Sequence, residues 1–200
     1  MFTGIVQEIG LVSHKEETDA GITLQINTSS RFLKDLNIGA SIAVNGVCLT
    51  VINFSKNKVS FDVIPETLRV TNLKFISKGS EVNLERSLKF GDEVGGHILS
   101  GHVSCTGYSN LIYKDEEVEL LIECPEAWVK YIFLKGYVAI NGASLTVAKK
   151  TDNSFSVFLI PETLNATNLS KISDKDLLNV EVDQTTYAAV KALESRNGEN

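Results

Sequence analysis

Cys48 and His102 are the side chains of this sequence best suited to chemistry near neutral pH. A thiol can act as a nucleophile, and an imidazole can accept or donate a proton. Both lie in segments that occur twice in the chain, but each residue is present in one copy only. Ser144 takes the place of Cys48 in the second copy, and Ile5 takes the place of His102 in the first. The sequence therefore predicts two related sites whose reactive residues differ.

The repeat keeps a constant offset of 96 residues over most of the chain. Residues 45–51 read Asn-Gly-Val-Cys-Leu-Thr-Val and return at 141–147 as Asn-Gly-Ala-Ser-Leu-Thr-Val, while Ile-Pro-Glu-Thr-Leu occurs unchanged at 64–68 and 160–164. The opening segments, 1–6 and 98–103, are offset by 97, so a one-residue length change follows them. Each unit is near the common domain size. We expect domains at 1–97 and 98–185, followed by a C-terminal helix and tail at 186–200.

Short segments with apolar residues at every second position predict half-buried antiparallel strands in both halves. They lie at 22–26, 59–63 and 82–84, and again at 118–122, 155–159 and 178–182. Several such strands per half indicate a small closed barrel, which removes exposed sheet edges. The expected fold class is therefore all-β, with two tandem antiparallel barrels.

Helices are expected at three places. Pro65 and Pro161 each follow a strand, and proline fits the first turn of a helix because it lacks an N–H and its φ is already helical. From Gln184 to about Arg196 the apolar spacing becomes helical, with Asp183 as the N-cap. This last helix is too short to be stable alone, so it should pack on another element or on a partner subunit.

Composition excludes several classes of protein. A net charge of −6 and a pI near 5.1 argue against a nucleic-acid partner, which would need a basic surface. Three cysteines without a Cys-x-x-Cys motif make a disulfide framework improbable. No basic leader and no long apolar run is present, so we expect a cytoplasmic protein without a membrane partner. The spacing of His97, His102 and Cys105 matches no standard zinc pattern, and no metal site is expected.

The candidate residues also have plain structural interpretations. Cys48 next to Leu49 could be a small buried hydrophobe, although Ser144 at the same place in the other copy argues against this, since an unpaired serine is costly in an apolar core. His97 and His102 could be structural histidines in the glycine-rich connection at 90–97 and just beyond it. The twin Pro-Glu-Thr-Leu could be a helix start only, but its unchanged recurrence indicates a shared ligand contact.

Several spaced motifs resemble the riboflavin synthase family of the alpha-chain type. They are Met-Phe-Thr-Gly-Ile-Val at 1–6, Asn-Gly-Val-Cys-Leu-Thr at 45–50, Gly-Gly-His-Ile-Leu-Ser-Gly-His at 95–102 and both copies of Ile-Pro-Glu-Thr-Leu. The resemblance runs from Met1 to the C-terminal helix. It implies two six-stranded Greek-key barrels per chain and a homotrimer held partly by the C-terminal helices. The N-terminal barrel of one subunit would face the C-terminal barrel of a neighbour, and association with lumazine synthase is a further expectation.

The resemblance also implies a reaction. Two molecules of 6,7-dimethyl-8-ribityllumazine would dismutate, one passing a four-carbon unit to the other, to give riboflavin and 5-amino-6-(ribitylamino)uracil, without a cofactor. Two identical substrates require two similar pockets, and the roles of donor and acceptor explain why the pockets differ. The competing hypothesis is a non-catalytic lumazine- or flavin-binding antenna protein of the same fold. Such proteins degrade the second pocket, whereas both pocket motifs are intact here.

The resemblance implies a set of substrate-binding residues for each barrel. Those expected at the N-terminal site are Gly4, Ile5 and Val6, then Cys48, Leu49 and Thr50, and then Asp62, Val63, Ile64, Pro65, Glu66 and Thr67. Those expected at the C-terminal site are Gly101, His102 and Val103, then Ser144, Leu145 and Thr146, then Phe158, Leu159, Ile160, Pro161, Glu162 and Thr163, with Lys135 reaching across a subunit interface. Ring edges should meet backbone groups, while threonine and glutamate hold the ribityl chain.

The chemically active pair is expected to be Cys48 and His102, with His102 as the better candidate for proton transfer. Further candidates for a catalytic role are Ser41, His97, Ser144, Thr146 and Asp183. The resemblance implies an aspartate at position 141 in many family members, whereas this chain has Asn141 and so carries no carboxylate there. A neutral asparagine can still bind a ring or cap a turn.

Overall fold

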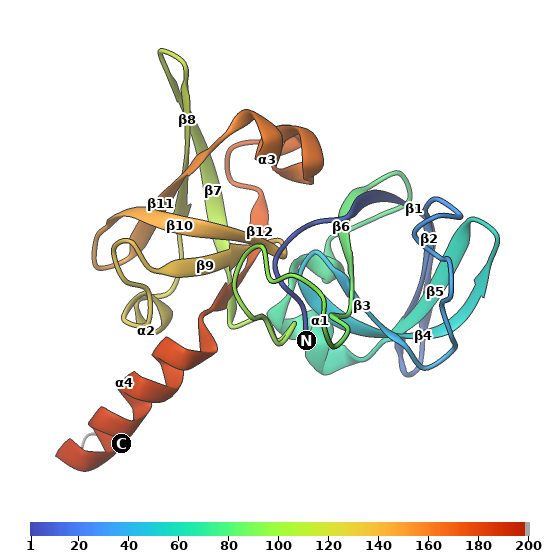
Figure 1. Cartoon of the computed structure of the whole chain (residues 1–200), viewed down its shortest axis with the longest axis horizontal. Helices are drawn as coiled ribbons and strands as arrows, with labels where there is room; N and C mark the ends of the chain where they lie inside the picture. The colour runs from blue at the N-terminus through green and yellow to red at the C-terminus, as the bar shows by residue number, and fades with distance from the viewer. Residues whose placement is uncertain (199–200) are drawn as a thin grey trace.

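The computed structural model describes residues 1–198 as two closed antiparallel barrels of six strands each, placed side by side (Figure 1). The strands of the first barrel are β1 (Glu8–Thr18), β2 (Gly21–Asn27), β3 (Ser41–Val44), β4 (Val47–Ser55), β5 (Lys58–Val63) and β6 (Glu81–Arg86). Those of the second are β7 (Cys105–Lys114), β8 (Glu117–Glu123), β9 (Tyr137–Ile140), β10 (Ala143–Lys150), β11 (Ser154–Leu159) and β12 (Leu177–Val182). Both barrels close with the same cyclic order, β1-β2-β5-β4-β3-β6 in the first and β7-β8-β11-β10-β9-β12 in the second. The all-β fold and the six-stranded barrels predicted from the sequence are confirmed.

Each barrel has its own hydrophobic core, formed by the inward-facing side of the alternating strands. Leu24, Phe61 and Leu84 are fully buried in the first barrel. Leu120 and Val157 hold equivalent inward positions in the second. Burying one such side chain contributes about 1.5–3 kcal/mol. The period-two pattern in the sequence therefore identified strands whose buried faces fill two separate cores.

A short helix follows the fifth strand of each barrel, as the two prolines predict. Helix α1 (Pro65–Val70) and helix α3 (Pro161–Ala166) both have proline in the first turn, and each is followed by a 3-10 turn, η1 (Asn72–Lys74) and η2 (Asn168–Lys171). Each 3-10 turn reaches across to the other barrel. The helices thus end where the two barrels meet.

Six buried asparagines join the barrels through reciprocal hydrogen bonds. Asn72 Nδ2 donates to Asn141 Oδ1 (3.0 Å), and Asn168 Nδ2 donates to Asn45 Oδ1 (3.1 Å). In the same way the backbone N–H of Asn72 donates to Asn179 Oδ1, and that of Asn168 donates to Asn83 Oδ1, both at 2.7 Å. Because these four bonds form two pairs related by the 96-residue offset, the joint is a pseudo-two-fold contact between the two copies.

Asn141 belongs to this joint. Its φ is 45°, and that of Asn45 is 46°, a left-handed conformation that asparagine adopts more readily than most residues. Its Oδ1 accepts hydrogen bonds from Asn72 Nδ2 and from the N–H of Asn179 (2.9 Å). An aspartate would offer the same acceptor oxygen. The role that the structure shows for Asn141 is therefore in the contact between the barrels.

The C-terminal helix α4 (Gln184–Asn197) projects from the second barrel in Figure 1. Asp183 caps it, as predicted, and accepts hydrogen bonds from the N–H (2.9 Å) and Oγ1 (2.7 Å) of Thr186. Tyr187 on α4 packs against Trp128 of α2 (Glu126–Val129) and against Tyr131, with ring centroids 6.0 and 4.7 Å apart. Glu199 and Asn200, the end of the expected tail, lie outside the described residues. Within residues 1–198, no helix combines the length and apolar character needed to span a membrane.

Candidate functional site

The first half-site lies at the start of β4, where Cys48 meets the opening segment of the second copy. The N–H of Cys48 donates to the carbonyl oxygen of Gly101 (2.9 Å). Gly101 has a φ of +78°, and a Cβ on it would lie 2.6 Å from the Cβ of Cys48. Only glycine fits this approach, because a side chain would be both strained and in collision. Val103, two residues further on, packs against the core of the first barrel.

The second half-site repeats this geometry with the copies exchanged. The N–H of Ser144 donates to the carbonyl oxygen of Gly4 (2.8 Å), and Gly4 has a φ of +74°. A Cβ on Gly4 would lie 2.5 Å from the Cβ of Ser144. Val6 packs against the core of the second barrel. The opening segment of each copy (residues 1–6 or 98–103) therefore contacts the barrel of the other copy.

This exchange corrects the expected grouping of the site residues. Gly4, Ile5 and Val6 were expected at the N-terminal site and Gly101, His102 and Val103 at the C-terminal site, but their contacts place them the other way round. The two openings cross at an antiparallel bridge, in which Phe2 N–H donates to Leu99 O (2.9 Å) and Leu99 N–H donates to Phe2 O (3.0 Å). Cys48 and His102 thus belong to one half-site, and Ser144 and Ile5 to the other. One of these two reactive residues was expected in each site, whereas the contact between Gly101 and Cys48 brings their segments together.

His97 and Ser144 form the best-defined polar pair of the second half-site. His97 Nδ1 lies 2.7 Å from Ser144 Oγ, and the imidazole stacks on Tyr137 with centroids 5.1 Å apart. Burial lowers the pKa of His97, although the charge of Asp183 acts in the opposite direction. The imidazole is therefore neutral at neutral pH. Its other nitrogen, Nε2, is buried and has no hydrogen-bond partner among residues 1–198.

Asp183, in addition to capping α4, supplies a negative charge that acts on His97. Burial raises the pKa of Asp183, but the hydrogen bonds from Thr186 and Thr185 outweigh it and leave the pKa below its ordinary value. Asp183 is therefore ionised at neutral pH. The structure brings together three of the residues that sequence reasoning ranked below Cys48 and His102.

The remaining candidates lie around these two centres. His102 is exposed, and its N–H donates to Ser100 Oγ (3.2 Å). Ser41 faces Thr50 across the β3–β4 ladder. Thr146 faces Tyr137 across β10 and β9. Lys135 is exposed and is tied to the second barrel by its N–H, which donates to Val147 O (2.9 Å).

The strand ends and helices expected to hold the ribityl chain provide both apolar and charged groups. Ile64 and Ile160, which precede α1 and α3, are more than half exposed. Glu66 on α1 forms an ion pair with Arg69 (2.6 Å), and its hydrogen bonds with that guanidinium lower the pKa of Glu66. Lys149 Nζ lies 5.5 Å from the ring centroid of Phe158 and forms an ion pair with Glu119 (2.7 Å). Leu49, Val63, Leu145 and Leu159 are buried core residues beneath these surfaces.

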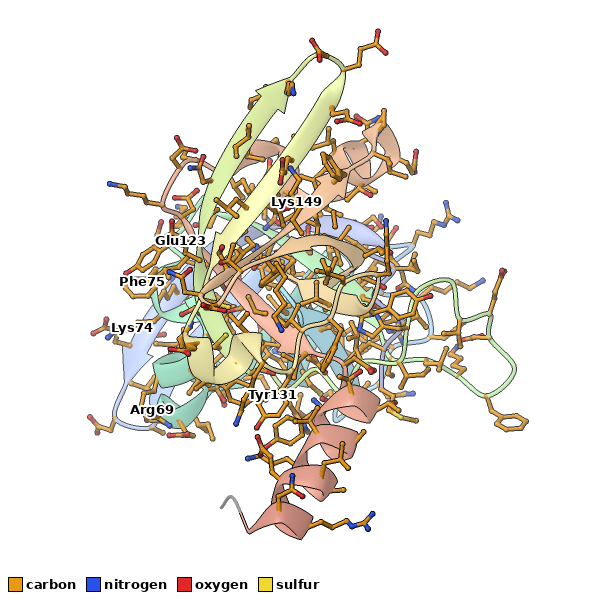
Figure 2. All side chains as sticks on the ribbon, turned by 90° about the vertical axis from the view of Figure 1, so that its left-hand side faces the viewer. Arg69, Lys74, Phe75, Glu123, Tyr131 and Lys149 are labelled. Atoms are coloured by element: carbon orange, nitrogen blue, oxygen red, sulfur yellow. The ribbon has the colours of Figure 1, made fainter. Side chains whose placement is uncertain are left out.

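Two large clefts between the barrels lie away from both half-sites. One, of about 640 Å³, is bordered by the asparagine joint, and the other, of about 540 Å³, by Arg69, Lys74, Phe75 and Glu123. Figure 2 shows these four side chains on one side of the molecule. Neither Cys48 nor Ser144 lines these clefts. Ile5 and Val6, in contrast, line a further cleft of about 610 Å³ together with Phe32 and Arg86. Within residues 1–198, no three His, Cys, Asp or Glu side chains converge to form a metal-binding group.

Comparison with known proteins gives consistent results over nearly the whole chain. The lumazine binding domain family matches twice, at residues 3–87 and 100–183. Riboflavin synthase of Chlamydia pneumoniae is 42% identical over 96% of this chain and 95% of its own, and riboflavin synthase of Escherichia coli (strain K12) is 40% identical over 97% and 92%. Among solved structures, LumP complexed with riboflavin is similar with a TM-score of 0.85 and 25% identity, over 92% of this chain and 100% of that one. With its two lumazine binding domains, the chain belongs to the riboflavin synthase family.

Proposed function

We propose that the protein is a riboflavin synthase, a transferase that converts two molecules of 6,7-dimethyl-8-ribityllumazine into riboflavin and 5-amino-6-(ribitylamino)uracil. The observation that carries this proposal is the presence of two intact half-sites of one design in a chain about 40% identical to riboflavin synthases. One ligand bound twice requires two such surfaces. A reaction in which the two copies of the ligand are treated differently requires that their reactive groups differ.

The proposed chemistry begins with loss of a proton from the C7 methyl group of one lumazine. The resulting carbanion attacks the second lumazine, and transfer of a four-carbon unit follows. The neutral His97 bonded to Ser144 is suited to accept or pass on a proton, because its pKa is lowered by burial. Cys48 and His102 supply the equivalent groups of the other half-site. Much of the rate would come from holding the two rings face to face.

The substrate contacts proposed for each half-site follow the exchanged arrangement. Backbone groups near Gly101 and Cys48 would bind one ring, and those near Gly4 and Ser144 the other. Glu66 and Thr67 on α1, and Glu162 and Thr163 on α3, would hold the ribityl chains. No cofactor or metal ion is part of the proposal.

We further propose that two half-sites from neighbouring subunits close on each other in a homotrimer. Ile64 and Ile160 are more than half exposed, and a neighbouring subunit would cover them. Helix α4, whose Leu193 is exposed, would contribute to the assembly. The domains are assigned to 1–97 and 98–185, with the helix and tail at 186–200. A cytoplasmic location and association with lumazine synthase complete the proposal.

The activity is tested by incubating the purified protein with 6,7-dimethyl-8-ribityllumazine and following both products. We expect one riboflavin and one 5-amino-6-(ribitylamino)uracil for every two lumazines consumed. Retention of lumazine without release of riboflavin would instead identify an antenna-type binding protein, the competing hypothesis; LumP, which is similar in fold, binds riboflavin.

The assembly is tested by mixing two inactive variants. Cys48→Ala/His102→Ala damages the first half-site, and His97→Ala/Ser144→Ala damages the second. If half-sites from different subunits meet, mixed oligomers contain interfaces where both partners are intact, and activity returns on mixing. If each chain works alone, the mixture stays as slow as its components.

A further inference from the structure

We propose that Glu85 and Glu181 are positioning residues, each of which holds in place the opening segment that completes the half-site of the opposite barrel. Glu85 lies on β6 of the first barrel and Glu181 on β12 of the second. They occupy the same place in the two copies, 96 residues apart. The positioning role is argued from contacts alone. Only its expected effect on turnover rests on the proposed function.

Each carboxylate accepts three hydrogen bonds from an opening segment. Glu85 Oε1 accepts from the N–H (2.6 Å) and Oγ1 (2.8 Å) of Thr3, and Oε2 accepts from the N–H of Gly4 (3.1 Å). Glu181 Oε1 accepts from the N–H (2.8 Å) and Oγ (2.7 Å) of Ser100, and Oε2 accepts from the N–H of Gly101 (3.1 Å). The two sets match atom for atom.

The bonded segments belong to the opposite half-sites. Glu85 holds the N–H of Gly4, whose carbonyl oxygen accepts from Ser144 of the second barrel. Glu181 holds the N–H of Gly101, whose carbonyl oxygen accepts from Cys48 of the first barrel. A carboxylate in one barrel is thus connected through a single glycine to the reactive residue of the other.

A second connection runs through the hydroxyl groups. Thr3 Oγ1, which donates to Glu85, also accepts from the N–H of Ile5 (3.4 Å). Ser100 Oγ, which donates to Glu181, also accepts from the N–H of His102 (3.2 Å). The carboxylate therefore fixes the direction of the hydroxyl group, and the hydroxyl group fixes the backbone of the residue after the glycine. In the second copy that residue is His102.

Burial of these two carboxylates has a cost in folding free energy. Glu85 is 3% exposed and Glu181 is 2% exposed, and neither forms an ion pair within residues 1–198. A buried carboxylate without a cation costs several kcal/mol unless hydrogen bonds compensate for it. Burial accordingly raises the pKa of both groups, against the lowering effect of their hydrogen bonds. An apolar residue would fill the same space at lower cost, but it would leave the opening segment without its acceptors.

Thiol modification tests the proposal without depending on substrate. Cys48 is half-buried while Cys105 and Cys124 are buried, so reaction of the native protein with a small aromatic disulfide reports on Cys48. In a Cys48→Ala/Ser144→Cys background the same reagent reports on position 144. Glu85→Gln and Glu181→Gln are then introduced into each background, which gives four chemically matched measurements. Gln keeps the shape of Glu but presents an NH2 group to a backbone N–H that needs an acceptor.

We expect a crossed result. Glu181→Gln should change the modification rate at Cys48 at least five-fold and leave position 144 within two-fold of its parent, while Glu85→Gln should do the reverse. Equal changes at both thiols, changes within the same barrel, or no change at either thiol would each overturn the proposal, since a purely structural role affects the two probes alike. Both variants should also lower kcat by more than ten-fold with a smaller change in KM. If the thiol result is crossed but no variant or parent makes riboflavin, the positioning role stands and the proposed function fails.

Milder variants cover the case in which Gln prevents folding. Ser100→Ala removes the hydroxyl group between Glu181 and His102, and Thr3→Val removes the one between Glu85 and Ile5 with little change in volume. The same crossed pattern is expected at smaller size, about two- to three-fold. An uncrossed pattern in these variants overturns the proposal equally.

Discussion

Replacing Gly101 by alanine should damage the first half-site and destabilise the protein by an amount that can be worked out from the structure. The new Cβ would lie 2.6 Å from the Cβ of Cys48 and 2.9 Å from Cε2 of Phe2. The φ of +78° adds a conformational cost of about 1–2 kcal/mol for a residue with a Cβ. Overpacking of a closed contact costs a further ~1–3 kcal/mol. The unfolding free energy should therefore fall by about 2–5 kcal/mol.

Gly39→Ala provides the matched control for this variant. Gly39 has a similar φ of +85°, but nothing lies within 4 Å of the Cβ that alanine would add. Its substitution therefore measures the conformational cost alone, about 1–2 kcal/mol. The difference between the two variants isolates the collision with Cys48.

Urea unfolding of the two variants and the parent measures this difference directly. We expect Gly101→Ala to be less stable than Gly39→Ala by at least 1 kcal/mol, a factor of about five in the unfolding equilibrium. The reactivity of the Cys48 thiol should change in Gly101→Ala only. Equal stability of the two alanine variants, with an unchanged Cys48, would show that the opening segment does not press on β4 and would refute the exchanged arrangement at this half-site.

Three further predictions concern the pair of half-sites and their joint. Cys48→Ala and His102→Ala should each slow turnover without abolishing lumazine binding, as measured by steady-state kinetics and fluorescence titration; unchanged rates would remove both from the reactive set. Because burial lowers the pKa of His97, the unfolded chain binds protons there more readily than the folded chain, so the unfolding free energy should fall as pH drops below about 6.5. His97→Gln should lose this part of the pH dependence, whereas the exposed His14→Gln should keep it, and identical pH profiles for parent and His97→Gln would contradict the assignment. Asn168→Ala should cost about 1–3 kcal/mol in urea unfolding, because it deprives Asn141 Nδ2 of its acceptor and removes the Nδ2 donor to Asn45 Oδ1 and to the carbonyl oxygen of Glu81; a change below about 0.5 kcal/mol would mean that the joint does not stabilise the fold.

The elements of this fold could be predicted because their signals are local. Alternation of apolar residues identified strands such as β2 and β11, since a strand with one buried face needs period two. Pro65 and Pro161 marked helix starts because proline has no N–H to leave unpaired in the first turn. Asp183 marked the start of α4 because its side chain accepts a hydrogen bond from a free backbone N–H there. The repeat then implied that one barrel type occurs twice.

The features that could not be predicted are the contacts between the two copies. The two opening segments are alike, so nothing in their sequence distinguishes a contact within one barrel from a contact with the other. His97 falls just before the second copy begins, and comparison of the copies provides no counterpart for it. Glu85 and Glu181 looked like ordinary polar residues at strand ends, although their presence at equivalent places was a signal that could have been followed. The asparagines of the joint were likewise visible as repeated residues, but their partners were not.

Because the opening segments are exchanged, the effect of a substitution in one copy depends on residues of the other copy. Gly101 is encoded in the second copy but contacts Cys48 of the first, and Gly4 is encoded in the first copy but contacts Ser144 of the second. A substitution in the opening segment of one copy therefore acts on the barrel of the other copy. Each opening segment has to remain compatible with the barrel of the other copy, because it packs there. Residues that adapt together in this chain should pair 102 with 48 and 5 with 144, across the repeat and not within it.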